Sequence, residues 1–358
     1  MPSSADPSPN GSAAAESAVR AAGPAPLPVA LLPVALLSVA LLPVATVDLG
    51  GTHVRAAVVD RSGTVLRRIR RATPVDAPRP DILPELLTEI AAGEALAGAV
   101  VGVPGIVDHD ADALVRAPNL PPAWLPRLTG AWLSEAAGLP VTLGNDADLA
   151  AVGEASFGAG RHHRDVVYVT ISTGVGAGVV VNRSLVRGQH SGGEIGHTVI
   201  DRQAAREGRA CTVETLGAGP AIARAAAEAG LAERDDALAD LVRAGHPAAT
   251  GVWDRAMEAV GIGVANLAWL LAPQVVVIGG GVGRNTDLVL PRIAAVLGRH
   301  GPVAPGGIEV KGAELGDDAG LIGAAAWFAA VGRPLAPAGR AHGARAGATT
   351  DRAGDGDG

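Results

Sequence analysis

The hydrophobic and polar positions along the chain predict three opening strands, then alternating helices and strands. Short apolar runs bounded by glycine and charged turns predict the opening strands at 44–48, 54–60 and 64–71. Farther along, runs with helical periodicity alternate with continuous apolar runs typical of buried strands. The predicted helices are 81–95, 124–137, 147–157, 218–229, 236–244, 256–271, 288–297 and 320–331. The later predicted strands are 96–103, 141–146, 274–278 and 308–311.

The opening arrangement recurs in the second half of the chain, because residues 166–187 again give strands around a glycine-rich turn. This repetition predicts an α/β fold of two related domains with a cleft between them. We assign residues 43–138, joined by the C-terminal helix at 320–332, to an N-terminal domain. Residues 139–319 form a larger C-terminal domain in this interpretation.

The two ends of the chain have few periodic apolar residues. Residues 1–26 and 333–358 are rich in small and polar residues, and we expect both to be disordered. Residues 27–47 contain a repeated pentapeptide, (Pro/Ser)-Val-Ala-Leu-Leu, that degenerates in its last copy, and they are long enough to span a bilayer. Prolines interrupt this run, and its last copy continues into the first predicted strand, so we interpret residues 1–42 as disordered or low-complexity sequence outside the membrane.

Composition and charge narrow the classes of function. The net charge of −7 and the lack of a Lys/Arg-rich block argue against nucleic acid as a partner. Aromatic residues make up only 2% of the chain, so the core must consist of Val, Leu, Ile and Ala. Cys211 is the sole cysteine, which excludes an intrachain disulfide and a multi-cysteine zinc site and is consistent with a cytoplasmic protein.

Two glycine-rich turns between predicted strands have residues suited to anion binding. The first is DLGGTH (48–53) and the second is TISTGVGAG (170–178). Small residues let backbone amides approach a phosphate closely, and the hydroxyls can bond to it. Asp48 can hold Mg²⁺ through water. Neither turn is a P-loop or a dinucleotide fingerprint, and an ordinary hairpin turn is the alternative for each.

Two further motifs carry polar side chains suited to a sugar. In GNDAD (144–148) a strand passes into a helix, where Asp146 can accept a hydroxyl proton during phosphoryl transfer and Asn145 can bond to a sugar hydroxyl. The alternative is that these residues only cap the helix. In GGEIGH (192–197), Glu194 and His197 are three residues apart and can converge on one polyol, with Glu214 following.

Taken in order, these motifs resemble the ROK family of sugar kinases and regulators, in the actin-like ATPase superfamily. DLGGTH and STGVGAG resemble its two phosphate loops, GNDADLAAVGE its catalytic-base motif, and GGEIGH its sugar-binding signature. GVPGIVD (102–108) and APNL (117–120) resemble its sugar-side segments, and residues 214–222, 261–283 and 313–325 its C-terminal segments. The resemblance covers residues 43–331.

The resemblance implies two actin-like (ribonuclease H-like) domains and ATP-dependent, Mg²⁺-assisted phosphorylation of a hexose, with glucose to glucose 6-phosphate as the first expectation. It also implies a cytoplasmic homodimer. Asp146 would be the general base. The sugar would contact Gly105, Asn119, Asn145, Glu194, His197 and Glu214. ATP and Mg²⁺ would lie against Asp48, Gly50, Gly51, Thr52, Thr173, Gly174 and Gly176, with Gly280 and Gly281 at the nucleoside.

Two departures from the family pattern bear on activity. His53 stands where the family usually has Lys. Family members commonly bind zinc through the histidine of GEIGH and three cysteines, whereas residues 201–214 keep only Cys211, one residue off register. We therefore expect no zinc site and a less ordered sugar site.

Other functions remain open from the sequence. One is a regulator that binds a sugar without chemistry, although only 47 residues precede Asp48 and they show no helix-turn-helix pattern. A catalytically degenerate family member is another. The acceptor can also be fructose, N-acetylmannosamine or N-acetylglucosamine, and the donor can be polyphosphate.

Overall fold

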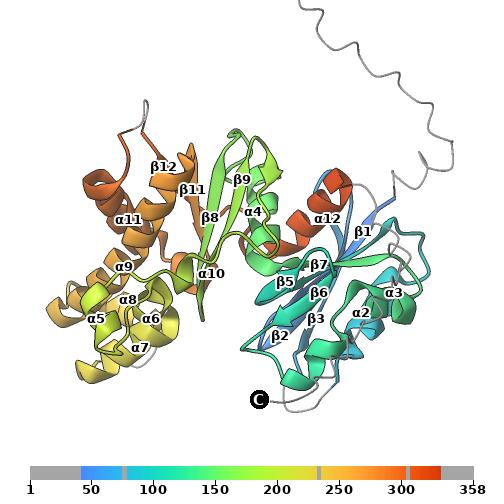
Figure 1. Ribbon diagram of the computed structural model, residues 1–358, viewed down its shortest axis with the longest axis horizontal. Coiled ribbons are helices and arrows are strands. Elements are labelled where there is room, and N and C mark those ends of the chain that lie inside the picture. The colour runs from blue at the N-terminus through green and yellow to red at the C-terminus, as the bar shows by residue number, and fades with distance from the viewer. Residues whose placement is uncertain (1–41, 75–78, 232–234, 304–306, 332–358) are drawn as a thin grey trace, which may run out of the picture.

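The computed structural model describes residues 42–74, 79–231, 235–303 and 307–331 (Figure 1). We expected residues 1–42 and 333–358 to be disordered. All of these residues except residue 42 lie outside the part of the chain that the structure describes. Residues 27–41 of the apolar repeat lie outside it too. Among the described residues, no helix combines the length and the apolar character needed to cross a membrane.

Two five-stranded sheets of the same design form the two halves of the molecule (Figure 1). The first has the order β3-β2-β1-β4-β7, from Val65–Ala72, His53–Val59, Val44–Leu49, Gly98–Val103 and Val141–Asn145. The second has the order β10-β9-β8-β11-β12, from Ser184–Leu185, Val175–Val181, Val166–Ile171, Val275–Gly279 and Glu309–Gly312. In each sheet three antiparallel strands are followed by two parallel ones.

The sequence explains where each strand lies within its sheet. The central strands β4 and β11 are continuous apolar runs, and every residue in them is buried. By contrast, the edge strand β3 alternates between half-buried and exposed positions and carries four arginines. The recurring α/β architecture predicted from the sequence is therefore confirmed.

Two helices lie between the sheets, α4 at Asp146–Ser156 and α12 at Ala319–Val331 (Figure 1). α4 packs on β8 and β9, whereas α12 packs on β1 and β4, so their mutual contact joins the two halves. The helices approach at two glycines. A Cβ atom on Gly323 would lie 1.7 Å from the Leu149 carbonyl oxygen, and one on Gly153 would lie 2.3 Å from that of Ala319.

The remaining helices pack on or around the sheets. Next to the first sheet are α2 (Ile82–Ala91), the 3₁₀ helix η1 (Pro122–Arg127) and α3 (Gly130–Ala137), with the hairpin β5–β6 (Ile106–Asp108, Ala113–Arg116). Around the second sheet are η2 (Ile195–His197), α5 (Arg202–Arg206), α6 (Val213–Gly217), α7 (Gly219–Glu228), α8 (Asp235–Arg243), α9 (Pro247–Leu271), α10 (Gly280–Gly283) and α11 (Thr286–His300), and η3 (Gly316–Asp318) precedes α12.

Three sequence predictions differ from the structure. The single helix expected at 124–137 is two elements, because the Thr129 hydroxyl accepts from the Trp132 amide and starts a new helix there. The helix expected at 256–271 begins nine residues earlier, at Pro247, with His246 as its cap. Finally, the sequence interpretation placed residues 139–145 in the second domain. In the structure, β7 (Val141–Asn145) instead pairs with β4 and belongs to the first sheet.

Candidate active site

The first glycine turn connects β1 to β2 and is held tightly. The Gly50 amide donates to the His53 carbonyl oxygen at 2.9 Å. On the other side, the Thr73 hydroxyl donates to the Gly50 carbonyl oxygen at 2.7 Å. Thr52 and His53 are exposed, and Gly51 lies against the backbone of Asn119. The turn therefore presents backbone and a hydroxyl to solvent, as a phosphate loop requires.

The second glycine turn connects β8 to β9 and is braced by Glu214. One carboxylate oxygen of Glu214 accepts from the Val175 amide at 3.0 Å, and a Cβ atom on Gly174 would lie 2.5 Å from the same oxygen. Thr173 at the tip is exposed. Glu214, expected on the sugar side, thus reaches the turn that we assigned to phosphate.

Two other glycine positions lie where the resemblance implies nucleotide contacts. Gly280 lies against the backbone of Ile171, and a Cβ atom on Gly281 would lie 3.6 Å from the Ser172 hydroxyl. A Cβ atom on Gly176 would lie 3.5 Å from that of Ala147, which places β9 beside the start of α4. The second turn is therefore close both to the glycine segment after β11 and to the residue that follows Asp146.

Asn145 caps α4 and also fixes a second segment. Its side-chain oxygen accepts from the amides of Ala147 at 2.9 Å and Asp148 at 3.0 Å. Its amide nitrogen donates to the Gly105 carbonyl oxygen at 2.9 Å. Gly105 has φ +99° in close contact with Arg116, which only glycine tolerates. The capping function weighed from the sequence is present, and it places Gly105 beside the predicted base.

Asp146 is the first residue of α4 and lies among other acidic groups. Its pKa is raised to about 7, mainly by burial and in addition by the Asp48 and Glu194 carboxylates, while the Ala147 amide, 2.8 Å from Oδ1, opposes the rise. Its side chain still keeps some solvent exposure. A partly accessible carboxylate with a pKa near neutrality is well suited to accept a proton at physiological pH.

Asp48 at the end of β1 forms an ion pair with Arg55, a residue that the sequence analysis did not single out. Arg55 stands directly opposite Asp48 in the β1–β2 register and also lies 3.7 Å from Asp317. Burial raises the pKa of Asp48 despite this arginine. Arg55 could have been found from the sequence, because a hairpin closed by Gly50-Gly51 places Arg55 directly opposite Asp48.

Glu194 and His197 converge as their spacing predicted. His197 Nε2 lies 3.7 Å from Glu194 Oε2, and both side chains are well exposed. The segment before them is fixed to β9, because the Ala177 amide donates to the Gly193 carbonyl oxygen at 2.9 Å. The Glu194 carboxylate also raises the pKa of Asp146, so Glu194 lies within electrostatic reach of the predicted base.

Asp148 is a second acidic residue of α4 that the sequence analysis did not assign. It is 1% exposed, and neither of its carboxylate oxygens has a hydrogen-bond partner among the described residues. Its pKa is raised to about 7, first by burial and then by the Asp146 and Glu194 carboxylates. The Ser191 hydroxyl and the Arg187 guanidinium oppose it, although the serine geometry falls short of a hydrogen bond.

The segment that carries the family's zinc ligands is held here by backbone hydrogen bonds. The Ile200 amide donates to the Cys211 carbonyl oxygen at 2.8 Å, and the Val213 amide donates to that of Thr198 at 3.1 Å. Within the described ranges no cluster of three or more His, Cys, Asp or Glu side chains can hold a metal ion. The donor set present at 198–213 therefore does not fit zinc.

The repeated sheets, each opening with a glycine turn, and the acidic helix between them place the protein in the class of actin-like ATPases. Within that class the chain belongs to the ROK family, whose profile matches residues 44–331. A glucokinase of Thermotoga maritima is 32% identical over 305 residues, which cover 78% of this chain and 95% of that protein.

Two solved structures have the same fold. A ROK family glucokinase from Streptomyces griseus, in complex with glucose and AMPPNP, matches with a TM-score of 0.68 and 30% identity over 79% of this chain and 98% of that chain. A ROK hexokinase from Thermus thermophilus matches with a TM-score of 0.68 and 32% identity over 80% of this chain and 97% of that chain.

Proposed function

We propose that this protein is an ATP-dependent hexose kinase with Asp146 as its general base and glucose as the first acceptor to test. One observation carries the proposal: a partly exposed carboxylate with its pKa raised to about 7 lies next to the second glycine turn and within electrostatic reach of Asp48, before the first turn, and of Glu194. The S. griseus relative holds glucose and AMPPNP together, which supports the same two ligands here.

In the proposed reaction the sugar hydroxyl oxygen attacks the γ-phosphorus of ATP and the bond to the β–γ bridging oxygen breaks. The hydroxyl proton passes to Asp146, and ADP leaves. Backbone amides of the two turns, with Thr52 and Thr173, bind the phosphates and stabilise the developing charge. Asn119, Asn145, Glu194 and His197 orient the sugar, while Glu214 positions the second turn through Val175.

Among the described residues, Asp48 is placed to hold the metal that such a reaction needs. Mg²⁺ prefers oxygen ligands and keeps several waters, with one or two carboxylates and substrate phosphates completing its shell. Asp48 supplies one carboxylate next to the first turn, with 16% of its side chain exposed, and would hold the ion through water. The ion, when bound, neutralises charge on the phosphates. Arg55 keeps the Asp48 carboxylate oriented in its absence.

The decisive experiment replaces the base. Asp146→Asn removes the proton acceptor, so we expect kcat to fall by about 10²–10⁴-fold with sugar binding and folding retained. The measurement is ADP release with ATP and each member of a hexose panel. Asp240→Asn is the matched control, because Asp240 has an 80% exposed side chain on the outer helix α8. Undiminished turnover in Asp146→Asn excludes the proposed mechanism.

The same panel settles the finer assignments. Fructose, N-acetylmannosamine and N-acetylglucosamine are the competing acceptors, and replacing ATP with polyphosphate tests the donor. A saturable thermal shift with a sugar, but no ADP release with any, identifies a sugar-binding regulator or a degenerate enzyme. From the family alone we also propose a homodimer in the cytoplasm, which analytical ultracentrifugation and cell fractionation test.

A further inference from the structure

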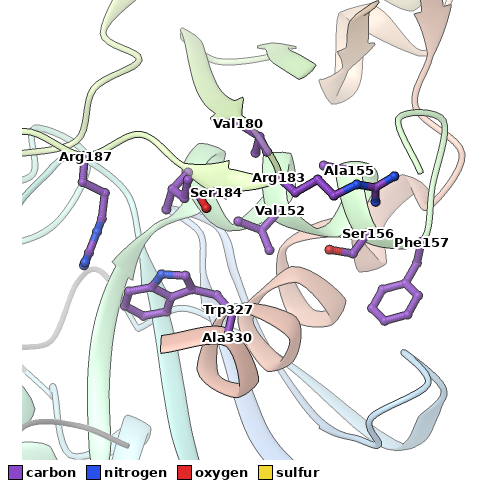
Figure 2. Close-up of a pocket in the computed structure, with 11 residues that line it drawn as sticks. Val152, Ala155, Ser156, Phe157, Val180, Arg183, Ser184, Arg187, Trp327 and Ala330 are labelled. Carbon is purple, nitrogen blue, oxygen red and sulfur yellow. The ribbon is translucent and has the colours of Figure 1, made fainter. Parts of the chain in front are cut away.

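A cavity lies at the end of α4 opposite to Asp146. Its volume is about 430 Å³, and its walls come from the last turn of α4, the β9–β10 hairpin and the C-terminal part of α12 (Figure 2). None of its lining residues is among those assigned to the sugar or to ATP, although Arg187 also acts on the Asp148 carboxylate, and the end of α4 lies roughly 15 Å from Asp146 along the helix. An occupant would contact elements that pack on both sheets.

The cavity combines cationic, hydroxyl and apolar groups. Arg183 and Arg187 line it from the hairpin, with the Ser156 and Ser184 hydroxyls, and no acidic residue is among its described lining residues. Figure 2 shows Arg183 extending along the last turn of α4 and Arg187 at the other end, where its guanidinium lies 5.5 Å from the centre of the Trp327 ring. The rest of the wall is apolar.

The local charge balance is positive. α4 ends at Ser156 and α12 at Val331, and each helix C-terminus carries roughly half a negative elementary charge. The two positive charges of the guanidinium groups exceed the combined negative charge of the two helix ends. Neither arginine forms an ion pair among the described residues, although the whole chain has a net charge of −7. The cavity is therefore a site where an anion is attracted on an otherwise acidic protein.

The backbone that presents Arg183 is strained. Asn182 and Arg183 have φ +52° and +63°, so both are left-handed, as in the two-residue hairpin turn whose second position favours glycine. A side chain in this conformation costs about 1 kcal/mol. The turn is nevertheless fixed, since the Arg183 amide donates to the Arg164 carbonyl oxygen at 2.9 Å and the Asn182 amide to Asp165 Oδ1 at 2.8 Å. Because arginine is unfavourable in this backbone conformation, its presence at position 183 suggests that the side chain has a function.

We propose that this cavity binds a small organic phosphate that carries a second anionic group. Arg183 with the Ser156 hydroxyl and Arg187 at the opposite end receive the two anionic groups, because guanidinium forks bond strongly to phosphate and carboxylate oxygens. The carbon skeleton lies against Val152 and Trp327, which is largely buried and contributes to the cavity wall. A cavity of this volume suits a molecule of a few carbon atoms.

The test is calorimetric titration of the full chain with 3-phosphoglycerate, with inorganic phosphate and glucose 6-phosphate as comparison probes. We expect saturable binding of 3-phosphoglycerate, weakened at least about tenfold in Arg183→Ala and in Arg187→Ala. Arg284→Ala is the control, because Arg284 lies near Gly281 at the proposed nucleotide position. It should leave this affinity unchanged. Weaker binding of inorganic phosphate shows that the second anionic group contributes.

A second variant separates binding from structure. Arg183→Gly relieves the left-handed strain, so we expect it to raise Tm by roughly 2–4 °C while it weakens binding as much as Arg183→Ala does. The proposal is overturned if 3-phosphoglycerate shows no saturable heat up to about 10 mM. It is also overturned if only Arg284→Ala abolishes binding, or if Arg183→Gly lowers Tm, because Arg183 then serves the turn or the helix end.

Discussion

At the scale of residues, the two aspartates of α4 form a pair with opposed requirements. Asp146 must be ionised to accept a proton, whereas Asp148 is almost fully buried and without a hydrogen-bond partner in the described structure. Two nearby carboxylates in a poorly solvated site cannot both ionise easily. We therefore interpret Asp148 as the member of the pair that keeps its proton when Asp146 loses its own.

This interpretation gives a prediction for the pH dependence of turnover. kcat/KM should fall as the pH falls through about 7, because protonation of Asp146 removes the base. In this interpretation Asp148 is already neutral when Asp146 ionises, so Asp148→Asn should leave the acidic limb at the same pH, with little loss at the plateau. Kinetics from pH 5 to 9 measure the limb. A limb that moves to lower pH in Asp148→Asn would show that Asp148 carries a negative charge beside the base and would contradict the interpretation.

Stability provides a second readout of the same variant. The pKa of Asp148 is raised from 3.8 to about 7 in the folded state, so its contribution to stability is fully present below pH 3.8 and lost as the pH rises through 7. Asp148→Asn should consequently increase the free energy of unfolding at pH 8, by on the order of 1 kcal/mol or more, and increase it less at pH 5, where only part of the contribution is lost. Urea unfolding at both values measures the difference. If the substitution acted only through packing, the free energy of unfolding would change by the same amount at pH 5 and at pH 8.

At the scale of elements, the crossing of α4 and α12 leaves no room for a side chain. A Cβ atom on Gly323 would lie 1.7 Å from the Leu149 carbonyl oxygen, so Gly323→Ala must separate the two helices. We expect it to lower the free energy of unfolding by about 3 kcal/mol or more. Gly298→Ala on α11 is the control. No atom lies within 4 Å of its added Cβ, and it should stabilise by up to about 1 kcal/mol.

The segment that replaces the family's zinc site leads to a metal-removal prediction. Backbone bonds between 198–200 and 211–213, with Thr212 capping α6, hold this segment without metal ligands. A chelator selective for zinc should therefore leave Tm and kcat unchanged, whereas removing Mg²⁺ should abolish turnover. Thermal unfolding and the ADP-release assay measure the two effects. A drop in Tm with the zinc chelator would show a metal site that these residues do not reveal.

The accuracy of the sequence predictions depends on whether the signal is local. Continuous apolar runs predicted β4 and β11 well, because a buried parallel strand needs only such a run. The break at Thr129 was missed, since Pro126 and the apolar residues around it also fit one helix. Asp148 could not be recognised, because an acid in the first turn of a helix is ordinarily an exposed partner of the helix dipole. Its burial depends on the packing of α4 against β9, where a Cβ atom on Gly178 would lie 2.9 Å from the Asp148 Cα atom.

At the scale of the whole molecule, α4 connects the two sites. Its first residue is Asp146, next to Ala147 at the second glycine turn and within electrostatic reach of Asp48 before the first, and its last turn lines the proposed anion-binding cavity. Glu154 in between is fully buried, and its carboxylate accepts from the amides of Ala159 at 2.8 Å and Leu315 at 2.8 Å. The helix is therefore tied to the segment that leads into α12, and a change in the angle between the sheets must involve both helices.

The boundary of the folded unit gives the last prediction. Deleting residues 1–42 preserves every strand of the first sheet, including the bond from the Ala97 amide to the Pro43 carbonyl oxygen at 2.9 Å. We expect Tm and kcat to equal those of the full chain. Deleting residues 1–47 instead removes most of β1, which pairs with both β2 and β4, and should prevent folding. Thermal unfolding monitored by circular dichroism compares the two. A Tm lowered by several degrees in the shorter deletion would show that the apolar repeat contributes to the core.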